Sequence, residues 1–438
     1  MPASLPELDN FRIEISENQV AHLIFDMPDR TMNVFSNKAI HELGAFANWL
    51  PDSGVKGVVV CSGKSNAFCV GADLSELGEA YDMIVKARKQ DRFNIAYTHF
   101  FPLSQAIRAL ENCGKPVASA IAGLALGGGC ELVLGTHYRV LVDSPSAALG
   151  LPESLVGLFP GAGGTQRIPR IIGVEASLPI LLEGGRLSGK DALEAGLANE
   201  LVSAGDELAA AEKWVLAQQH DVAQAWDQEG YQPHCAVELA NTLQPHRDKY
   251  LEQTLGHYPA PLAILDCLQQ GLAQDFDGAI RTEMSLFSYL IQRREPRNMI
   301  QTLFSGKLSY ERAVKKDRLS EGAQSAIQQL SKELHALNAN DNLIKMGFTF
   351  DDQTSCEPVQ KRVVEGYWFR GLKQTADLVA LDAIISTARA LGNTLSTEEQ
   401  TMVDFAIVNT TGFPAYLGGP VSLAYEMGSL LSASTNEC

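Results

Sequence analysis

Short apolar runs alternate with polar turns over the first part of the chain. Between residues 10 and 70 the pattern predicts strand, strand, helix and strand, in that order. The ranges are 11–15, 20–25, 37–50 and 57–61. A helical pattern over about 83–110 then precedes two more β-rich runs, at 117–121 and 138–142. The first half of the chain is therefore predicted to be α/β.

The strand signals fade after about residue 170, and residues 175–335 have the pattern of a series of helices. Apolar residues recur at three- and four-residue steps late in this region, at Ile327, Leu330, Leu334 and Leu337. The polar run 338–342 that follows predicts a boundary. The second half is therefore predicted to be all-α.

Composition limits the classes of function. A chain of 438 residues is long enough for about two or three domains of ordinary size. Hydrophobic residues at 45% and charged residues at 20% are typical of globular proteins. The formal net charge of −17 argues against a general nucleic-acid binder or a membrane-surface binder. An anionic ligand must therefore be bound by positively charged or N–H groups within its own site.

Cysteine usage and the N-terminal sequence point to a cytoplasmic protein. The eight cysteines include no CxxC pair and no regular spacing, so neither a disulfide framework nor a metal site is indicated. The N-terminus has no basic region followed by an apolar run, and the most apolar stretch, near 116–130, is interrupted by glycines. We expect neither secretion nor a membrane span.

The strongest chemical signal is a glycine-dense turn, Ala-Leu-Gly-Gly-Gly-Cys-Glu, at 125–131. It has the pattern of a strand that turns into a helix, where free backbone N–H groups can hold an oxyanion. Glu131 on that helix and Glu153 on a later loop have the chemistry of a general base and a general acid. Taken singly, the turn fits tight packing, Glu131 fits a partner of the helix dipole, and Glu153 fits a surface residue.

Two further segments favour the catalytic interpretation over the structural ones. They are Phe-Cys-Val-Gly-Ala-Asp-Leu at 68–74 and Pro-Gly-Ala-Gly-Gly-Thr-Gln-Arg at 160–167. Together with the turn and the two glutamates, they resemble the enoyl-CoA hydratase/isomerase (crotonase) superfamily. The resemblance implies a ββα spiral fold for the first domain, an α/β crotonase-type domain, followed by the all-α half.

The resemblance also implies roles for named residues. The backbone N–H groups of Ala72 and Gly128 would form the oxyanion hole, and Glu131 and Glu153 would activate water and protonate the α-carbon. The implied reaction is hydration of a trans-2-enoyl-CoA to a 3-hydroxyacyl-CoA. The coenzyme A thioester is then a substrate, and neither a metal nor another cofactor is implied. A glutamate that acts as an acid near neutral pH needs a raised pKa, so we expect at least one of the two to be desolvated.

The resemblance places coenzyme A binding after the second strand, where Arg30 can meet a phosphate, and at Asp73 in the 68–74 loop. An exposed, solvated arginine is the alternative for Arg30. The two glutamates are slightly further apart in sequence than in typical relatives, and we expect the turn at 143–146 to absorb the difference.

Beyond the first domain, the chain resembles the α-subunit of the bacterial multifunctional fatty-acid β-oxidation enzyme. Residues 175–320, with Tyr-Pro-Ala-Pro at 258–261, resemble its helical connector, and 411–420 resemble the end of its 3-hydroxyacyl-CoA dehydrogenase part. No G-x-G-x-x-G follows a strand in this region, so the NAD-binding domain is expected to be missing. The predicted domains are 1–190 (hydratase/isomerase), 191–320 (connector) and 321–438 (helical C-terminal unit).

Two alternative functions stay open. A Δ3-Δ2-enoyl-CoA isomerase needs only one proton-shuttling carboxylate. A non-catalytic scaffold subunit of a β-oxidation complex is suggested by the missing NAD-binding domain and the helical tail, which has the character of a docking surface for a thiolase-like partner. A homo-oligomer is the alternative assembly.

Overall fold

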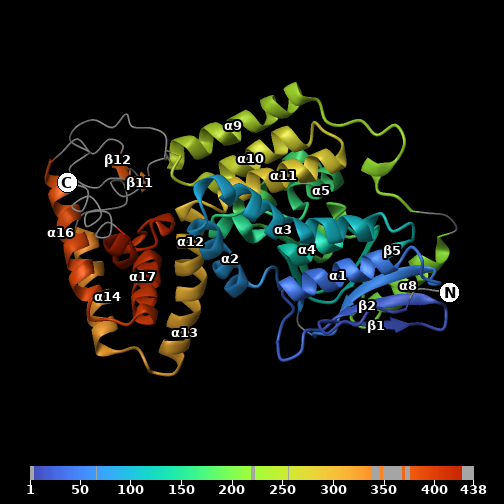
Figure 1. The fold of residues 1–438 in the computed structure, drawn as a ribbon, viewed down its shortest axis with the longest axis horizontal. Helices are drawn as coiled ribbons and strands as arrows, with labels where there is room; N and C mark the ends of the chain where they lie inside the picture. Colours follow the sequence, from blue (N-terminus) through green and yellow to red (C-terminus); the bar gives the residue numbers. More distant parts are fainter. Residues whose placement is uncertain are drawn as a thin grey trace. The chain divides into compact units, whose positions relative to one another are not determined.

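The described part of the chain forms two compact units (Figure 1). The computed structural model describes residues 4–65, 67–218, 222–254, 256–336, 346–348, 367–369 and 375–426. The first unit consists of Met1–Pro245 with Ala263–Gln292, and the second of His246–Leu262 with Arg293–Cys438. The three-part division at residues 190 and 320 stays a prediction.

A six-stranded sheet forms the base of the first unit. Its strands, in spatial order, are β1 (Phe11–Ile15), β2 (Val20–Phe25), β3 (Gly57–Ser62), β5 (Val117–Ile121), β7 (Tyr138–Val142) and β10 (Glu200–Val202). β1 is antiparallel to β2, and all other neighbours are parallel. The run Val58, Val59 and Val60 is fully buried, as expected for a parallel strand that is covered on both faces.

A smaller four-stranded sheet carries the loops of interest. It contains β4 (Ala67–Cys69), β6 (Leu124–Leu126), β8 (Ala148–Gly150) and β9 (Arg186–Ser188), in that order. β4, β6 and β8 are parallel, and β9 is antiparallel to β8. In the chain, β4 follows β3, β6 follows β5, and β8 follows β7. The chain therefore passes repeatedly from the large sheet to the small one.

Helices cover these sheets. In the first unit they are α1 (Asn37–Trp49), α2 (Leu74–Lys86), α3 (Lys89–Glu111), α4 (Gly128–Leu134), η1 (Pro152–Val156), α5 (Gly164–Ile172), α6 (Val174–Glu183), α7 (Gly189–Glu194), α8 (Glu207–Ala217), η2 (Ala225–Asp227) and α11 (Phe276–Leu290). α9 (Ala236–Thr254) and α10 (Pro259–Gly271) contribute residues to both units. Ala211 and Val215 of α8 pack on Val59, Ala118 and Val140, so α8 covers one face of the large sheet.

The second unit is mainly helical. Its elements are α12 (Arg294–Met299), the π-helical η3 (Ile300–Gly306), α13 (Lys307–Lys315), α14 (Glu321–Ala336), β11 (Met346–Phe348), β12 (Tyr367–Phe369), α16 (Thr375–Gly392), α17 (Thr397–Thr411) and η5 (Ala415–Leu417). Leu330 and Leu334 of the predicted stripe are buried against Val403 and Ile407. Leu337 and the predicted boundary at 338–342 lie outside the described residues.

The predicted fold class is confirmed: an α/β first part precedes a helical second half. Every strand predicted from the apolar pattern is present. The helix predicted over 83–110 is instead two helices, α2 and α3, because Ala87 and Arg88 have extended backbones. The strands β4, β8, β9, β10, β11 and β12 were missed because three residues are too few to show a period. Of the short strands, only the end of β6 was expected, at the glycine turn. Among the helices in the described ranges, none is long and apolar enough to span a bilayer.

Candidate active site

Three loops meet at one edge of the small sheet. β4, β6 and β8 are parallel neighbours, so their carboxyl ends lie at the same edge. The segments that follow these ends are 71–73, 127–131 and 151–153. In open sheets with parallel strands, ligands bind outside the carboxyl ends of the strands. All the predicted site residues except Arg30 lie on these loops or on the first turns that follow them.

The loop after β4 fixes the backbone of Ala72. The carbonyl of Gly71 accepts from Phe35 N at 2.8 Å, and Asp73 N donates to Phe35 O at 2.9 Å. These two bonds make a parallel bridge between Phe35 and Ala72. The residue at the centre of such a bridge directs its own N–H away from its partner. The N–H of Ala72, an exposed residue, is therefore directed away from Phe35.

The glycine turn lies beside this loop. A Cβ on Gly71 would lie 3.9 Å from Gly128 N, and Gly71 itself has φ +105°, a conformation that favours glycine. Gly128 is the first residue of α4, whose first hydrogen bond runs from Glu131 N to Gly127 O. The N–H of Gly128 therefore has no acceptor within its helix. Ala72 and Gly128 thus supply two backbone donors on adjacent loops.

Glu131 projects from α4 toward the start of α5 and is buried. Its Oε1 accepts from Ala162 N at 2.6 Å and from Gly164 N at 2.8 Å. A Cβ on Gly164 would lie 2.9 Å from that oxygen, so the absence of a side chain at 164 permits the close approach. Burial raises the pKa of Glu131 above its ordinary value, whereas the two N–H donors and the charge of Arg167 oppose the rise.

Glu153 lies in the first turn of η1, directly after Pro152. Its Oε1 is close to the glycine turn, because a Cβ on Gly127 would lie 3.0 Å away. Its Oε2 is buried and has no hydrogen-bond partner within the described residues. Burial first, and then the charges of Glu131 and Glu283, raise the pKa of Glu153 well above its usual range. Both glutamates are therefore desolvated, as a carboxyl group that acts as an acid near neutral pH requires.

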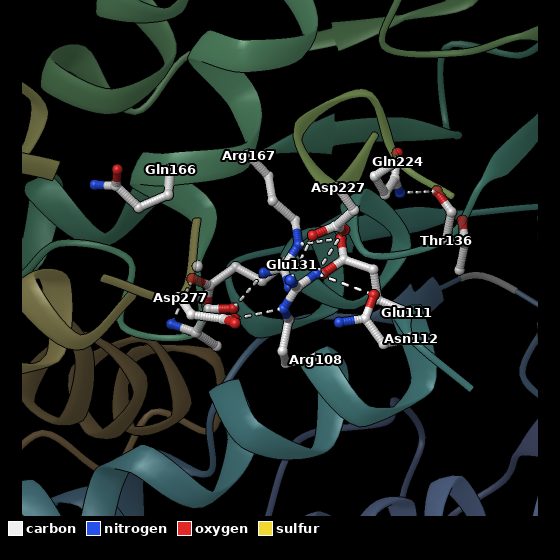
Figure 2. A network of polar contacts seen from close by, with 12 residues as sticks. Arg108, Glu111, Asn112, Glu131, Thr136, Gln166, Arg167, Gln224, Asp227 and Asp277 are labelled. Carbon is white, nitrogen blue, oxygen red and sulfur yellow. Dashed lines mark hydrogen bonds and ion pairs between the residues drawn. The ribbon is translucent and has the colours of Figure 1, made fainter. Parts of the chain in front are cut away.

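Arg167 anchors the 160–167 segment (Figure 2). Its Nε and Nη2 donate to the two carboxylate oxygens of Glu111 at 3.0 and 2.9 Å, and both side chains are fully buried. Its Nη1 donates to Ala162 O at 2.9 Å. Both backbone polar groups of Ala162 are therefore hydrogen-bonded to side chains: its carbonyl accepts from Arg167, and its N–H donates to Glu131.

A second arginine extends this network. Arg108 on α3 donates to Glu111 at 2.8 Å and also bonds Asp227 and Asp277, as Figure 2 shows. The Glu111 carboxylate thus lies between two guanidinium groups. This arrangement compensates a charge that is otherwise removed from water.

Arg30 and Asp73 form an ion pair. Arg30 Nη2 lies 2.8 Å from Asp73 Oδ2, with 53% of the arginine side chain exposed and 6% of the aspartate side chain exposed. Asp73 Oδ1 also accepts from Ser75 N at 3.0 Å and so caps α2. Arg30 is therefore fixed beside the Ala72 loop. The role of these two residues in coenzyme A binding stays a prediction.

A cavity of about 650 Å³ lies among α1, α2 and α3. Its lining is mainly apolar and includes Ile40, Met83 and Ile95. Two residues near lining positions in the sequence approach the glycine turn: Phe35 lies two positions before Asn37, and Leu103 directly follows Pro102. A Cβ on Gly128 would lie 3.1 and 3.4 Å from their side chains. The cavity is therefore close to the loops that carry the candidate donors.

Two buried glutamates near the site, Glu111 and Glu283, were missed by the sequence analysis. Glu111 ends α3, and Glu283 lies in the middle of α11. Neither belongs to a local motif, and a glutamate in a helix is ordinarily exposed. Only the packing of distant helices reveals them.

The site has no cluster suited to a metal ion. Within the described ranges, no three His, Cys, Asp or Glu side chains are grouped to hold one. Cys130, beside the glycine turn, is fully buried, and burial raises the pKa of its thiol far above its ordinary value. It is therefore not an activated nucleophile.

Known proteins resemble the chain in sequence. The family described as enoyl-CoA hydratase/isomerase matches residues 16–229. A protein named fatty acid oxidation complex subunit alpha from Shewanella loihica is 34% identical over 307 residues, which cover 68% of this chain and 41% of the relative. The protein of that name from Shewanella amazonensis is 33% identical over 293 residues, covering 65% and 39%. The chain thus spans about two fifths of the length of these curated relatives.

Among solved structures, an enoyl-CoA hydratase from Bacillus halodurans is 19% identical to this chain, with a TM-score of 0.46. The match covers 67% of this chain and 99% of the hydratase chain.

Proposed function

Residues 16–229 belong to the enoyl-CoA hydratase/isomerase family, and we propose that the chain hydrates a trans-2-enoyl-CoA to a 3-hydroxyacyl-CoA. Membership of this family supports a crotonase-type enzyme of acyl-CoA metabolism. The observation that best supports hydration is the meeting of two backbone donors, the buried Glu131 and the half-buried Glu153 at the carboxyl ends of β4, β6 and β8.

The backbone donors of Ala72 and Gly128 would hold the thioester oxygen. When water attacks C3 of the enoyl group, the π electrons of the C2–C3 double bond move toward the carbonyl, and the thioester oxygen becomes an enolate. Two preorganised N–H groups stabilise this charge more than they stabilise the neutral carbonyl. The direction of the Ala72 N–H and the unpaired helix position of Gly128 support this role.

The different environments of the two glutamates suggest a division of labour. Glu131 accepts two backbone N–H bonds, which favour its carboxylate, so it is suited to take a proton from the attacking water. Glu153 has a buried Oε2 without a partner in the described ranges, which favours its protonated form. It is suited to donate a proton to C2 and form the new C–H bond.

We place the acyl chain in the cavity among α1, α2 and α3, which is mainly apolar and whose lining includes Asn37 and Pro102, within two positions of the Phe35 and Leu103 side chains near Gly128. Coenzyme A would then extend past the Ala72 loop toward Arg30, whose exposed guanidinium can meet a phosphate. These placements follow from the proposed position of the thioester oxygen.

Isomerisation of a 3-enoyl-CoA is the second candidate. That reaction removes a proton from C2 and returns one to C4, which one carboxylate can do. Glu153 supports it, because its Oε2 is not engaged by another described group whereas Glu131 Oε1 already accepts two bonds. Both reactions place negative charge on the thioester oxygen, as a 3-hydroxy enolate in hydration and as a dienolate in isomerisation, so the same two backbone donors would serve either one.

The curated relatives are named as subunits of a fatty acid oxidation complex, which supports a place in fatty-acid β-oxidation. A thiolase-like partner and a homo-oligomer are two proposed assemblies. Size-exclusion chromatography of extract from the native host, followed by mass spectrometry of the fraction that contains this chain, separates them.

The test is turnover of purified protein on crotonyl-CoA and on a medium-chain 2-enoyl-CoA, followed by the loss of enoyl-thioester absorbance. Glu131→Gln and Glu153→Gln are the informative variants, and Glu194→Gln, an exposed glutamate on α7, is the matched control. We expect each of the first two to reduce kcat by at least about 100-fold, and the control to retain activity.

The outcomes separate the alternatives. Turnover of a 3-enoyl-CoA without hydration would favour the isomerase. No turnover of either substrate would remove the enzymatic proposal and leave the scaffold subunit. Full activity of both glutamine variants would mean that the site lies elsewhere.

A further inference from the structure

The start of α5 divides its backbone donors between two glutamates. The N–H groups of Ala162 and Gly164 bond Oε1 of Glu131, at 2.6 and 2.8 Å. The alternate N–H groups, of Gly163 and Thr165, bond Glu283 at 2.5 and 3.0 Å. Four consecutive N–H groups thus face two buried carboxyl groups on alternate sides.

We propose that Glu283 of α11 is a positioning residue for Glu131: it holds residues 162–165 in the one conformation in which their alternate N–H groups fix the Glu131 carboxylate. This inference rests on the proposed function, in which Glu131 acts on water. Glu283 itself would touch neither substrate nor water.

The first argument is the weakness of the segment by itself. Glycine occupies 161, 163 and 164, and Gly163 has φ +98°. Glycine loses more conformational freedom on folding than any other residue, so such a turn needs external contacts to stay in one conformation. Arg167 holds the carbonyl of Ala162, and Glu283 holds the two N–H groups that Glu131 does not use.

The second argument is that both carboxylate oxygens of Glu283 accept hydrogen bonds from this segment. Its side chain is buried, and its Oε2 also accepts from the hydroxyl of Thr165. Removing the carboxylate would leave two backbone N–H groups and one hydroxyl without this acceptor in a buried place, which costs free energy for each group. The turn would then relax, and the two donors on Glu131 would move with it.

The third argument is electrostatic. Glu283 is surrounded by Glu131 from α4, Glu153 from η1, Arg167 from α5 and Cys267 from α10. Burial first, and then the charge of Glu131, raise the pKa of Glu283 above its ordinary value. The charge of Glu283 in turn helps to raise the pKa of Glu153. Glu283 therefore acts on both glutamates, by hydrogen bonds on one and by charge on the other.

The variants separate charge from geometry. Glu283→Gln removes the charge and replaces one acceptor oxygen by an amide donor. Glu283→Asp keeps the charge and shortens the side chain by one methylene group. Met284→Ala is the matched control, because Met284 is fully buried on the same helix and makes none of these hydrogen bonds.

The first readout is steady-state hydration of crotonyl-CoA across pH. For Glu283→Gln we expect kcat to fall by about 10- to 100-fold with little change in KM, as for a small misplacement of a catalytic group. We also expect the alkaline limb of the pH profile to move to lower pH, because Glu153 loses a neighbouring negative charge. Glu283→Asp should keep the alkaline limb in place and recover part of kcat.

The second readout does not depend on activity. Hydrogen–deuterium exchange of the peptide that contains 160–167 should accelerate in Glu283→Gln and not in Met284→Ala. If Glu283→Gln does not fold, Thr165→Val, which removes only the hydroxyl donor, should show the same changes to a smaller degree.

These readouts keep two failures apart. A wild-type protein without turnover overturns the proposed function, while faster exchange in Glu283→Gln would still show that Glu283 holds the segment. An active wild-type protein whose Glu283→Gln variant keeps kcat, pH profile and exchange unchanged overturns this inference alone. Equal losses of kcat in Glu283→Gln and Met284→Ala would also overturn it, since they would indicate general destabilisation.

Discussion

Glu131 and Glu153 have opposite hydrogen-bonding environments at the same edge of one sheet. Glu131 Oε1 accepts two backbone N–H groups, whereas Glu153 Oε2 is buried without a partner in the described part of the chain. Neighbouring strands β6 and β8 lead to these two residues. Two identical side chains are thereby given different proton affinities, which is the arrangement that acid–base chemistry with a pair of carboxyl groups requires.

The first prediction concerns stability and pH. Because the pKa of Glu153 is raised by burial, the folded protein keeps a proton that the unfolded chain releases above about pH 4.3. The free energy of unfolding should therefore fall as pH rises from that value toward the raised pKa. Glu153→Gln has no such proton and should reduce the slope, by at most about 1.4 kcal/mol per pH unit.

Urea unfolding between pH 4.5 and 7.5 measures this slope. Tryptophan fluorescence reports mainly on the first unit, which contains Trp49, Trp214 and Trp226. The exposed Glu194→Gln variant serves as the control. A Glu153→Gln variant that is less stable than wild type at pH 7.5 would contradict the prediction, since it would show that the carboxylate is well compensated.

The second prediction concerns the packing of the glycine turn. A Cβ on Gly129 would overlap the backbone carbonyl of Cys69 on β4, and a backbone atom cannot move aside as a flexible side chain can. We expect Gly129→Ala to destabilise the protein by about 1–3 kcal/mol. It should also reduce turnover, because β4 leads directly to the Ala72 donor.

Gly78→Ala is the matched control for this substitution. Gly78 lies inside α2, with open space around its Cα, and alanine there should stabilise the helix by about 1 kcal/mol. Thermal melts and crotonyl-CoA turnover of both variants test the prediction. If Gly129→Ala is as stable as Gly78→Ala, the prediction is wrong, and α4 can shift away from β4 without a loss of stability.

The third prediction concerns Glu111. Its carboxylate lies between Arg167 and Arg108, and both Glu111 and Arg167 are fully buried. Glu111→Ala would leave the buried guanidinium of Arg167 without its charge partner and should cost about 3–5 kcal/mol of unfolding free energy.

The exposed ion pair between Arg88 Nε and Asp91 Oδ2, 2.7 Å apart, gives a reference for this experiment. Asp91→Ala should change the unfolding free energy by no more than about 1 kcal/mol. Urea denaturation of the two variants under the same conditions makes the comparison. Similar losses from both would indicate that water reaches Arg167 when Glu111 is removed.

The sequence was sufficient to predict the fold class and the motif-bearing loops. The long strands have a clear apolar pattern, and Gly128, Glu131 and Glu153 belong to local motifs that can be recognised in the sequence. The three-residue strands β4, β6 and β8, which bring those loops to one edge, carry no periodic signal of their own. Their parallel order became visible only in the folded chain.

Glu283 and Glu111 show why the rest could not be predicted. Each becomes notable only because a distant helix buries its carboxylate against backbone donors or guanidinium groups. In the sequence both are ordinary helical glutamates. Burial is a property of tertiary packing, and no short window of sequence contains it.

The last prediction concerns Arg30. Its guanidinium pairs with Asp73 at 2.8 Å but remains about half exposed, so it can meet a phosphate of coenzyme A without leaving the aspartate. We expect Arg30→Ala to raise KM for a 2-enoyl-CoA by about 10-fold at low salt, which corresponds to one charge-assisted contact. The kcat should change little, because the contact is the same in the ground state and the transition state. A 2-enoyl thioester of N-acetylcysteamine carries no phosphate, so its KM should be the same for both proteins. An equal rise in KM for the two thioesters would mean that Arg30 acts by holding Asp73 and the Ala72 loop, and not by binding coenzyme A.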